Sequence, residues 1–311
     1  MNRVLMGPRA IHRPPGKTGR EEFPVRCRWI CLAVALVCWA CASGHEAPYD
    51  RPLPLQRDPA TLARRIEALA AGCPRLTVER LGTVVYPGFA APVHLLRYVP
   101  EGEVGRRVLV TGGLHGNEPA GVEAALRLAE RICADPGRWP RTAFDVVPLV
   151  NPWGWAHHMR RNRDGRDVNR DFASFDTQEA RLFRPVGDAR RYDLMVDLHE
   201  DPAARGFYLY QYDRPDPALC RRIIARIGEM GFPPEREVRM IALRADDGLI
   251  DAPGWGLVYM RLTRQFSITN YLRLENGPHV FTVETPPHLS LDDRCRIHLT
   301  AVEMFVDALA R

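Results

Sequence analysis

Short apolar runs alternate with amphipathic stretches along the chain from about residue 60 onwards. Seven runs are rich in β-branched and aromatic residues and have the length of single strands. These runs are 76–85, 93–98, 108–111, 144–150, 194–198, 207–212 and 280–283. Five stretches instead place their apolar residues at helical spacing, namely 61–71, 120–133, 177–183, 217–230 and 291–310. The order of these segments predicts strands that alternate with helices.

This alternation indicates an α/β domain with a largely buried sheet. We expect a single domain over residues 59–311, built on a central twisted, mixed but mostly parallel β-sheet with helices on both faces. A content of 46% hydrophobic and 26% charged residues agrees with a globular chain. We find neither an internal repeat nor a second linker in this part of the sequence.

The longest apolar run lies near the N-terminus, where residues 29–42 read WICLAVALVCWACA behind Arg26 and Arg28. A membrane-spanning helix needs roughly 20 residues, so this run is short for a span. It predicts a signal peptide over residues 1–42, followed by a proline-containing linker over 43–58. An uncleaved anchor or a buried helix is the alternative.

The end of the leader allows two forms of processing. Residues 40–42 have the small-x-small form of ordinary cleavage, whereas the sequence before Cys41 resembles a bacterial lipobox. We therefore expect export to a bacterial cell envelope, the periplasm or the medium, as a soluble protein or with a lipid anchor at Cys41. Contact with a membrane is expected only through that anchor or an uncleaved leader. Because the leader is long, a start of translation near Val25 is a further hypothesis.

The formal net charge of +5 resides in this leader. Residues 1–42 contain seven Lys and Arg residues and two Glu residues, and the rest of the chain contains 36 basic and 36 acidic residues. A balanced domain lacks the basic surface that nucleic acids require. The charge pattern therefore argues against a nucleic-acid partner.

Four cysteines follow the leader, namely Cys73, Cys133, Cys220 and Cys295. In an exported protein they allow three sets of two disulfides, and the sequence does not choose among them. Free buried thiols are an equally good interpretation. The spacing of these cysteines does not indicate a structural zinc site.

Candidate chemistry begins at the end of the predicted strand 108–111. The sequence VLVTGGLHGNEPAG breaks the strand at two glycines and places His115 and Glu118 in the turn before a helix. Ligands of open α/β sheets bind at this position, and a His and a Glu three residues apart can reach one metal ion. By itself the pair is weak evidence, because a solvated turn gives the same pattern.

Two further strand ends carry residues of the same kind. His199 ends the apolar run in LMVDLHE, and Glu284 ends the run in FTVETPP. Two His and one carboxylate leave a fourth position open for water, which is the pattern of a catalytic zinc. We interpret the other histidines of the predicted domain as surface or core residues: His94, His157, His158, His279, His288 and His298.

Residues 151–172 read NPWGWAHHMRRNRDGRDVNRDF and lie between these ligands. An Asn-Arg pair beside a metal suits a carboxylate, because a guanidinium offers two parallel charge-assisted hydrogen bonds and an amide adds another. Arg160 is a candidate for stabilising an oxyanion. The alternative for any one of these arginines is an ordinary solvated surface group.

In this order the motifs resemble those of the zinc metallocarboxypeptidases of the carboxypeptidase A type, together with the related aspartoacylase and succinylglutamate desuccinylase group. The shared order is HxxE, NPxG, an Arg two residues before an Asn, DxNR, a strand-end His and a strand-end Glu. The resemblance covers about residues 105–305. It implies one Zn²⁺ ion at the carboxyl edge of the sheet, held by His115, Glu118 and His199.

The resemblance also implies roles for the other motif residues. Asp167 would orient His115, Asn169 and Arg170 would bind the substrate carboxylate, Arg160 would stabilise the oxyanion and Glu284 would transfer protons. The substrate-capping tyrosine of the family is not assigned, since Tyr259 and Tyr271 both lie in the relevant stretch.

Three acidic residues bear on substrate preference, namely Asp246, Asp247 and Asp251. They would favour basic substrates if they lined the side-chain pocket, although acids in a loop are more often solvated.

These residues predict a metallocarboxypeptidase that removes the last residue of a peptide through a zinc-activated water. A zinc-dependent N-acyl amino acid deacylase or a murein peptide amidase is the alternative. The deacylases usually carry a further β domain after the catalytic Glu, and 27 residues follow Glu284 here, which favours the peptidase. A non-catalytic binding module is disfavoured, since neither the ligands nor Glu284 are missing. In either reaction the partner is a peptide or an N-acyl amino acid with a free carboxylate.

Overall fold

The computed structural model describes residue 49 and residues 53–212, 216–236, 245–252, 254–276 and 279–309. The predicted signal peptide, the start near Val25, Cys41 and most of the predicted linker lie outside the described residues. Within those ranges, no helix combines the length and the apolar character that crossing a membrane requires.

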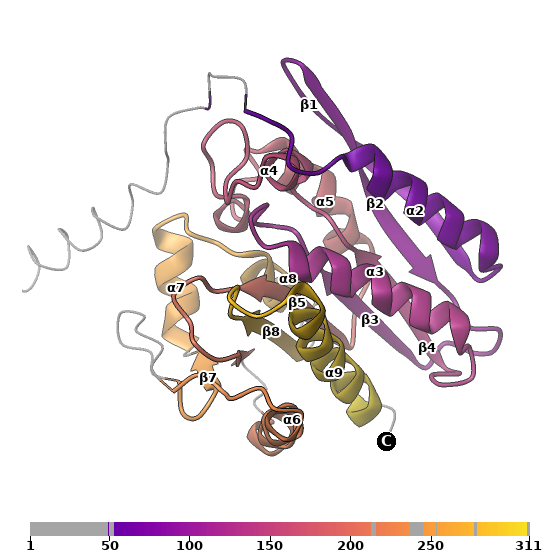
Figure 1. The fold of residues 1–311 in the computed structure, drawn as a ribbon, viewed down its shortest axis with the longest axis vertical. Helices are drawn as coiled ribbons and strands as arrows, with labels where there is room; N and C mark the ends of the chain where they lie inside the picture. The colour runs from indigo at the N-terminus through magenta and orange to yellow at the C-terminus, as the bar shows by residue number, and fades with distance from the viewer. Residues whose placement is uncertain are drawn as a thin grey trace, which may run out of the picture. The chain divides into compact units, whose positions relative to one another are not determined.

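An eight-stranded mixed sheet forms the centre of the fold, with the strand order β1-β2-β4-β3-β5-β8-β6-β7 (Figure 1). Its strands are β1 (Leu76–Tyr86), β2 (Phe89–Tyr98), β3 (Arg106–Thr111), β4 (Thr142–Val147), β5 (Leu194–Glu200), β6 (Tyr208–Tyr212), β7 (Leu249–Ala252) and β8 (His279–Thr285). The pairs β3–β4, β3–β5, β5–β8 and β6–β7 are parallel, and β1–β2, β2–β4 and β6–β8 are antiparallel. The predicted mixed, mostly parallel sheet is confirmed.

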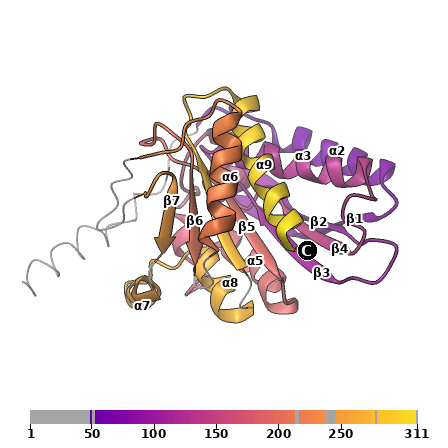
Figure 2. The ribbon, with the colours of Figure 1, turned by 90° about the horizontal axis from the view of Figure 1, so that it is seen from below.

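Helices cover both faces of this sheet, as predicted (Figure 2). One face carries α2 (Pro59–Gly72), α3 (Pro119–Ala134), α6 (Pro217–Glu229) and α9 (Leu291–Leu309), and the other carries α5 (Gln178–Ala189) and α8 (Ile268–Asn276). Each layer has its own apolar core. Phe305 of α9 stacks on Phe281 of β8 with ring centroids 4.0 Å apart, and Phe183 of α5 packs against Phe172 on the opposite face. The central strands are therefore buried on both sides, which explains their nearly continuous apolar sequences.

Most predicted boundaries differ from the structure by a few residues, and two of these differences have a clear physical reason. The strand predicted over 144–150 ends at Val147, since Pro148 has no N–H to continue the ladder. The helix predicted over 177–183 continues to Ala189 through Pro185. Packing of the buried Val186 in the core compensates for the hydrogen bond that the proline removes.

Five of the described elements escaped the sequence prediction. They are β7, α4 (Pro152–His157), the short helix η1 (Val168–Arg170), α7 (Gly254–Leu262) and α8. The strand β7 has four residues and α4 has six, so neither is long enough to show a periodic pattern. Both depend on tertiary contacts, because such short segments are unstable alone.

The cysteines outside the leader combine the two alternatives left open above. Cys73 after α2 and Cys133 in α3 form a disulfide, while Cys220 and Cys295 are buried free thiols. The disulfide joins two helices of the same layer and closes a chain segment with a sequence separation of 60.

The described end of the predicted linker packs on the domain. The amides of Gln56 and Arg57 donate to the carbonyl of Ala156, at 2.7 and 3.1 Å. The Arg57 guanidinium also donates to the carbonyl of Trp155 at 3.0 Å. This part of the linker is therefore bound to α4 and its neighbourhood.

Candidate active site

Three adjacent parallel strands bring the strand-end residues to one edge of the sheet. The strand β5 pairs with β3 on one side and with β8 on the other. His199 of β5 lies directly opposite Glu284 of β8 in this register. Since residues paired across strands have Cβ atoms about 5 Å apart, the topology by itself places these two side chains together.

The loop after β3 supplies the other two candidate ligands, and glycines determine its path. Gly113 has a φ of 63°, a conformation that favours glycine. A Cβ on Gly116 would lie 1.9 Å from the carbonyl carbon of Gly154, so the backbones of the HxxE and NPxG motifs are in direct contact. Asn151 stabilises this contact, because its side chain accepts from the amide of Gly154 at 2.9 Å. The NPxG motif thus supports the loop that carries His115 and Glu118.

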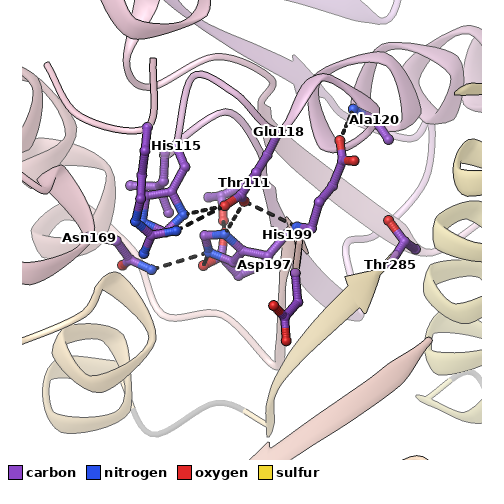
Figure 3. Close-up of polar contacts among 12 residues, drawn as sticks. Thr111, His115, Glu118, Ala120, Asn169, Asp197, His199 and Thr285 are labelled. Atoms are coloured by element: carbon purple, nitrogen blue, oxygen red, sulfur yellow. Dashed lines mark hydrogen bonds and ion pairs between the residues drawn. The ribbon is translucent and has the colours of Figure 1, made fainter. Parts of the chain in front are cut away.

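His115, Glu118 and His199 converge on one point (Figure 3). The Nδ1 atoms of the two histidines each lie 2.7 Å from a different carboxylate oxygen of Glu118. All three side chains are buried, and one donor atom from each lies within 4.8 Å of the others. A compact set of two imidazoles and one carboxylate fits a zinc ion.

Carboxylates behind the two imidazoles determine which nitrogen faces the common point. Nε2 of His115 lies 3.0 Å from Oδ1 of Asp167, and Nε2 of His199 lies 2.8 Å from Oδ2 of Asp197. A carboxylate accepts the proton of Nε2, which leaves Nδ1 as the metal-binding lone pair. The oxygen Oδ1 of Asp197 accepts from the Thr111 hydroxyl at 2.6 Å. The sequence analysis missed Asp197, although its position two residues before His199 places it on the same face of the strand.

The pKa values of the two glutamates of the site are shifted in opposite directions. Burial alone would raise the pKa of Glu118, but the imidazoles of His115 and His199 outweigh it and hold that pKa far below its ordinary value. Removal from water raises the pKa of Glu284 to about 8, and Glu118 and Asp201 contribute to the rise. Glu118 is therefore a permanent anion, whereas Glu284 can exchange a proton near neutral pH.

Arg160 forms hydrogen bonds to two of these acids. Its guanidinium donates to Oε1 of Glu118 at 3.3 Å and to Oδ2 of Asp167 at 3.1 Å. The side chain is 40% exposed, so it faces the cavity beside the candidate ligands.

Asn169 and Arg170 lie in the short helix η1 (Val168–Arg170). The amide nitrogen of the Asn169 side chain lies 3.2 Å from Nε2 of His199, and its oxygen accepts from the amide of Ile268 at 3.0 Å. Arg170 lines the same cavity and donates to the Asn169 carbonyl at 2.9 Å. The predicted carboxylate-binding pair is thus adjacent to the candidate metal ligands.

A second buried acid, Glu200, follows His199 directly. Its carboxylate accepts from the amide of Ala120 in the first turn of α3 at 2.6 Å and pairs with Arg294 of α9. The amide of Glu200 donates to Glu118 at 3.1 Å. These contacts join the end of β5 to two helices, which identifies Glu200 as a structural partner of the ligand strand.

One cavity of about 980 Å³ contains the site. His115, Glu118, Arg160, Asn169, Arg170, His199 and Glu284 all line it. The strand β6, which pairs with β8, adds Tyr208, Tyr210 and Tyr212 to the lining; they alternate along β6 and therefore face the same side. The sequence analysis missed these tyrosines, although their period-two spacing in YLYQY was a usable signal.

Other predicted candidates lie elsewhere. The Tyr271 hydroxyl donates to Asp188, and its ring packs on Phe175 with centroids 5.2 Å apart, away from the cavity. The side chain of Tyr259 is outside the described residues. His298 is fully buried, with Nε2 3.2 Å from the Thr285 hydroxyl, as expected for a core histidine.

Asp246, Asp247 and Asp251 are exposed, which agrees with the interpretation of these acids as solvated. Asp246 and Asp247 pair with Arg221 and Arg236, and Asp251 accepts from the side chain of Gln211. None of the three is among the described residues that line the cavity. They therefore give no basis for a preference for basic substrates.

Comparisons with known proteins show which families this chain is similar to. Residues 104–235 match the family model of the succinylglutamate desuccinylase/aspartoacylase catalytic domain. Carboxypeptidase 2 of Trichophyton tonsurans is 31% identical over 106 residues, which are 32% of this chain and 20% of that protein. An N-acyl-aromatic-L-amino acid amidohydrolase (carboxylate-forming) of Rattus norvegicus is 35% identical over 117 residues, which are 32% of this chain and 35% of that protein. The similarity thus spans about a fifth to a third of the relatives' length.

The fold is similar over a longer range. A metallo-carboxypeptidase from Burkholderia cenocepacia superposes with a TM-score of 0.62 at 18% sequence identity, over 80% of this chain and 68% of that one. At this identity the likeness concerns the fold. Together with the family match, it confirms the resemblance to the metallocarboxypeptidase and aspartoacylase group.

Proposed function

From its relationship to the hydrolases of the metallocarboxypeptidase and aspartoacylase group, we propose that this protein is a zinc-dependent carboxypeptidase. It would remove the C-terminal residue of a peptide, holding one Zn²⁺ ion through His115, Glu118 and His199. The observation that carries the proposal is the convergence of these three side chains in a cavity that Arg170 and Glu284 also line. Such a cavity would combine a metal site, a cation for a carboxylate and a proton-transfer group.

The positions of the cavity residues support a role for each of them in the proposed hydrolysis. Arg170 and Asn169 bind the terminal carboxylate, which fixes the scissile bond relative to the candidate ligands. A bound zinc ion would polarise the scissile carbonyl and acidify a water molecule. Glu284, with a pKa raised to about 8, takes the proton of the attacking water and returns it to the leaving nitrogen. Arg160 stabilises the negative charge that develops on the carbonyl oxygen.

An N-acyl amino acid deacylase is the second candidate. The match to the desuccinylase/aspartoacylase catalytic domain and the similarity to the rat amidohydrolase favour it. The same zinc ligands and the same arginine serve both reactions, because both substrates carry a free carboxylate beside an amide. The size of the cavity favours the peptidase, since about 980 Å³ accommodates more than a small acyl group.

One experiment tests both candidates. The zinc-loaded protein is incubated with a mixture of peptides, murein fragments and N-acyl amino acids, and the products are identified by mass spectrometry. We expect peptides shortened by one C-terminal residue, formed at least about 100-fold more slowly by the Glu284→Gln variant. Release of acyl groups alone would favour the deacylase, whereas cleavage inside peptides or no cleavage would refute both.

We further propose that the protein acts outside the cytoplasm, in the cell envelope or the medium. The disulfide between Cys73 and Cys133 supports this, since disulfides persist in oxidising compartments. Fractionation of cells followed by thiol labelling tests the proposal. A cytoplasmic protein with both thiols reduced would contradict it.

A further inference from the structure

The cavity continues past the candidate metal ligands along one face of the sheet. His199 and Glu284 form one row of paired residues at the strand ends. Asp197 and Thr282 form the next row, two residues back on the same strands. Side chains two apart point to the same face, and two residues span about 6.6 Å, so this row lies deeper in the cavity. Tyr212 of β6 flanks Thr282, with 3.3 Å between their hydroxyl oxygens.

The helix α8 closes this deeper part from the other side. The hydroxyls of Ser267 and Thr269 lie 2.7 Å apart, and both residues are buried cavity-lining residues. The intervening residue, Ile268, donates its amide to the side chain of Asn169. The start of α8 is therefore joined directly to the predicted carboxylate-binding pair. We name Ser267, Thr269, Thr282 and Tyr212 the polar floor.

The polar floor retains hydrogen-bonding capacity for a ligand. Each hydroxyl has one proton and two lone pairs, and one proton suffices for the contact within each pair. Tyr212 also contacts Thr269, which joins the four hydroxyls into one chain. Three of the four protons suffice for these three contacts, so one O–H group and several lone pairs stay available to a ligand. An aliphatic side chain placed here would displace water from these groups without replacing its hydrogen bonds, which is unfavourable.

The charges around the polar floor oppose an ionised side chain of either sign. Asp197 lines the cavity beside Thr282, and both of its oxygens already accept hydrogen bonds. It would repel a carboxylate. Arg273 lies next to the polar floor, with its guanidinium 4.9 Å from the ring centroid of Tyr212. Arg170 lines the same cavity. These two cations oppose the attraction that Asp197 would exert on an ammonium or guanidinium group.

We propose that the polar floor selects substrates whose carboxylate-bearing residue has an uncharged hydrogen-bonding side chain, such as Asn, Gln, Ser or Thr. This inference rests on the proposed function and specifies its substrate class. It applies equally to a peptide and to an N-acyl amino acid, because the same residue carries the free carboxylate in both.

Two series of substrates test this selection. One consists of N-acetyl-Ala-X peptides and the other of N-acetyl-X amino acids, and both are assayed with the zinc-loaded protein. X is Asn, Leu, Gln, Met, Phe, Glu or Lys, and Asn/Leu and Gln/Met are pairs of similar size. We expect kcat/KM to be at least about 10-fold higher for Asn than for Leu, and for Gln than for Met. A preference of that size for Leu, Met, Phe, Glu or Lys would overturn the inference.

The variant Thr269→Val removes one hydroxyl at nearly constant volume. It should lower the Asn/Leu ratio of kcat/KM about 10-fold. Thr300→Val, the same substitution in α9 outside the cavity lining, should leave that ratio unchanged. Tyr212→Phe is the replacement if Thr269→Val does not fold. An unchanged ratio in a folded Thr269→Val or Tyr212→Phe protein would refute the role of the polar floor.

Binding separates this inference from the proposed function. Affinities of N-acetyl-Asn and N-acetyl-Leu for the zinc-loaded protein are measured by calorimetry. If neither series is hydrolysed, the proposed function fails, but tighter binding of N-acetyl-Asn would still support the polar floor. Equal or tighter binding of N-acetyl-Leu would refute it whatever the turnover.

Discussion

Asp197 offers the sharpest test of how this site holds a metal ion. The residue is fully buried, and its two oxygens accept from Nε2 of His199 at 2.8 Å and from the Thr111 hydroxyl at 2.6 Å. In Asp197→Asn the amide oxygen can still accept from His199, and the new amide group can donate to Thr111. Shape and hydrogen bonding are thus retained while the negative charge is lost.

The loss of that charge should weaken zinc binding without unfolding the protein. A carboxylate behind a ligating imidazole increases the basicity of the metal-binding nitrogen, and removing such a partner typically costs 10–100-fold in affinity. We therefore expect the zinc dissociation constant to rise by about 10–100-fold, which corresponds to about 1.4–2.7 kcal/mol. Competition with a chelator of known affinity measures this constant.

A matched control uses the same substitution at the other end of β5. Asp193 accepts from the amide of Arg107 at 2.8 Å, far along the strand from His199. Asp193→Asn should keep the wild-type zinc affinity. If the Asp197→Asn protein folds, as judged by circular dichroism, and binds zinc within twofold of the wild type, then Asp197 does not tune the ligand and the reasoning is refuted.

Four other substitutions probe separate parts of the structure. Glu284→Gln should lower turnover by roughly 10²–10⁴ while zinc content persists, as steady-state kinetics and metal analysis would report; near-normal turnover would exclude Glu284 as the base. Arg170→Ala should reduce kcat/KM far more for substrates with a free carboxylate than for amidated analogues, and equal losses would assign it a structural role. Replacing Cys73 and Cys133 together by Ser should lower the unfolding free energy by up to about 4 kcal/mol, because the disulfide closes a segment of 60 residues; an unchanged denaturant midpoint would contradict this. Burial lowers the pKa of His298 to about 3, so below about pH 6.5 the unfolded chain binds a proton that the folded chain does not, and stability falls as the pH falls. Between pH 6.5 and 5 this residue should lower the unfolding free energy by about 2 kcal/mol, as measured by urea unfolding. The His298→Gln protein should lose that part of the decrease, and an equal decrease in the variant and the wild type would contradict the assignment.

The location of the candidate site at one edge of the sheet was predictable, because parallel strands end at the same edge. His199 and Glu284 each close an apolar run, and the sequence places both in strands that must lie in one buried sheet. Their direct pairing required the strand order, which hydrophobic pattern does not determine. Asp197 was missed for a related reason, since its contact with Thr111 links neighbouring strands that are 86 residues apart in sequence.

Loop chemistry was less predictable, because side-chain direction depends on tertiary contacts. Asp246 and Asp251 were candidates for a pocket only through their nearness in sequence to its expected walls. In the structure they bind Arg221 and Gln211. Conversely, Thr269 lies in a stretch with little periodic signal, and its position in the cavity follows from the packing of α8 on β8.

Asn169 shows why the metal centre and the polar floor should not be treated as independent. One end of its amide lies 3.2 Å from Nε2 of His199, and the other accepts from the amide that begins α8. The residue therefore joins a candidate metal ligand to the helix that carries Ser267 and Thr269. A displacement of α8 by a poorly fitting side chain would act through Asn169 on the orientation of His199. If the protein is the proposed metallohydrolase, we expect substrate fit to act on the orientation of His199 through this amide, so selectivity should be expressed in kcat as well as in KM.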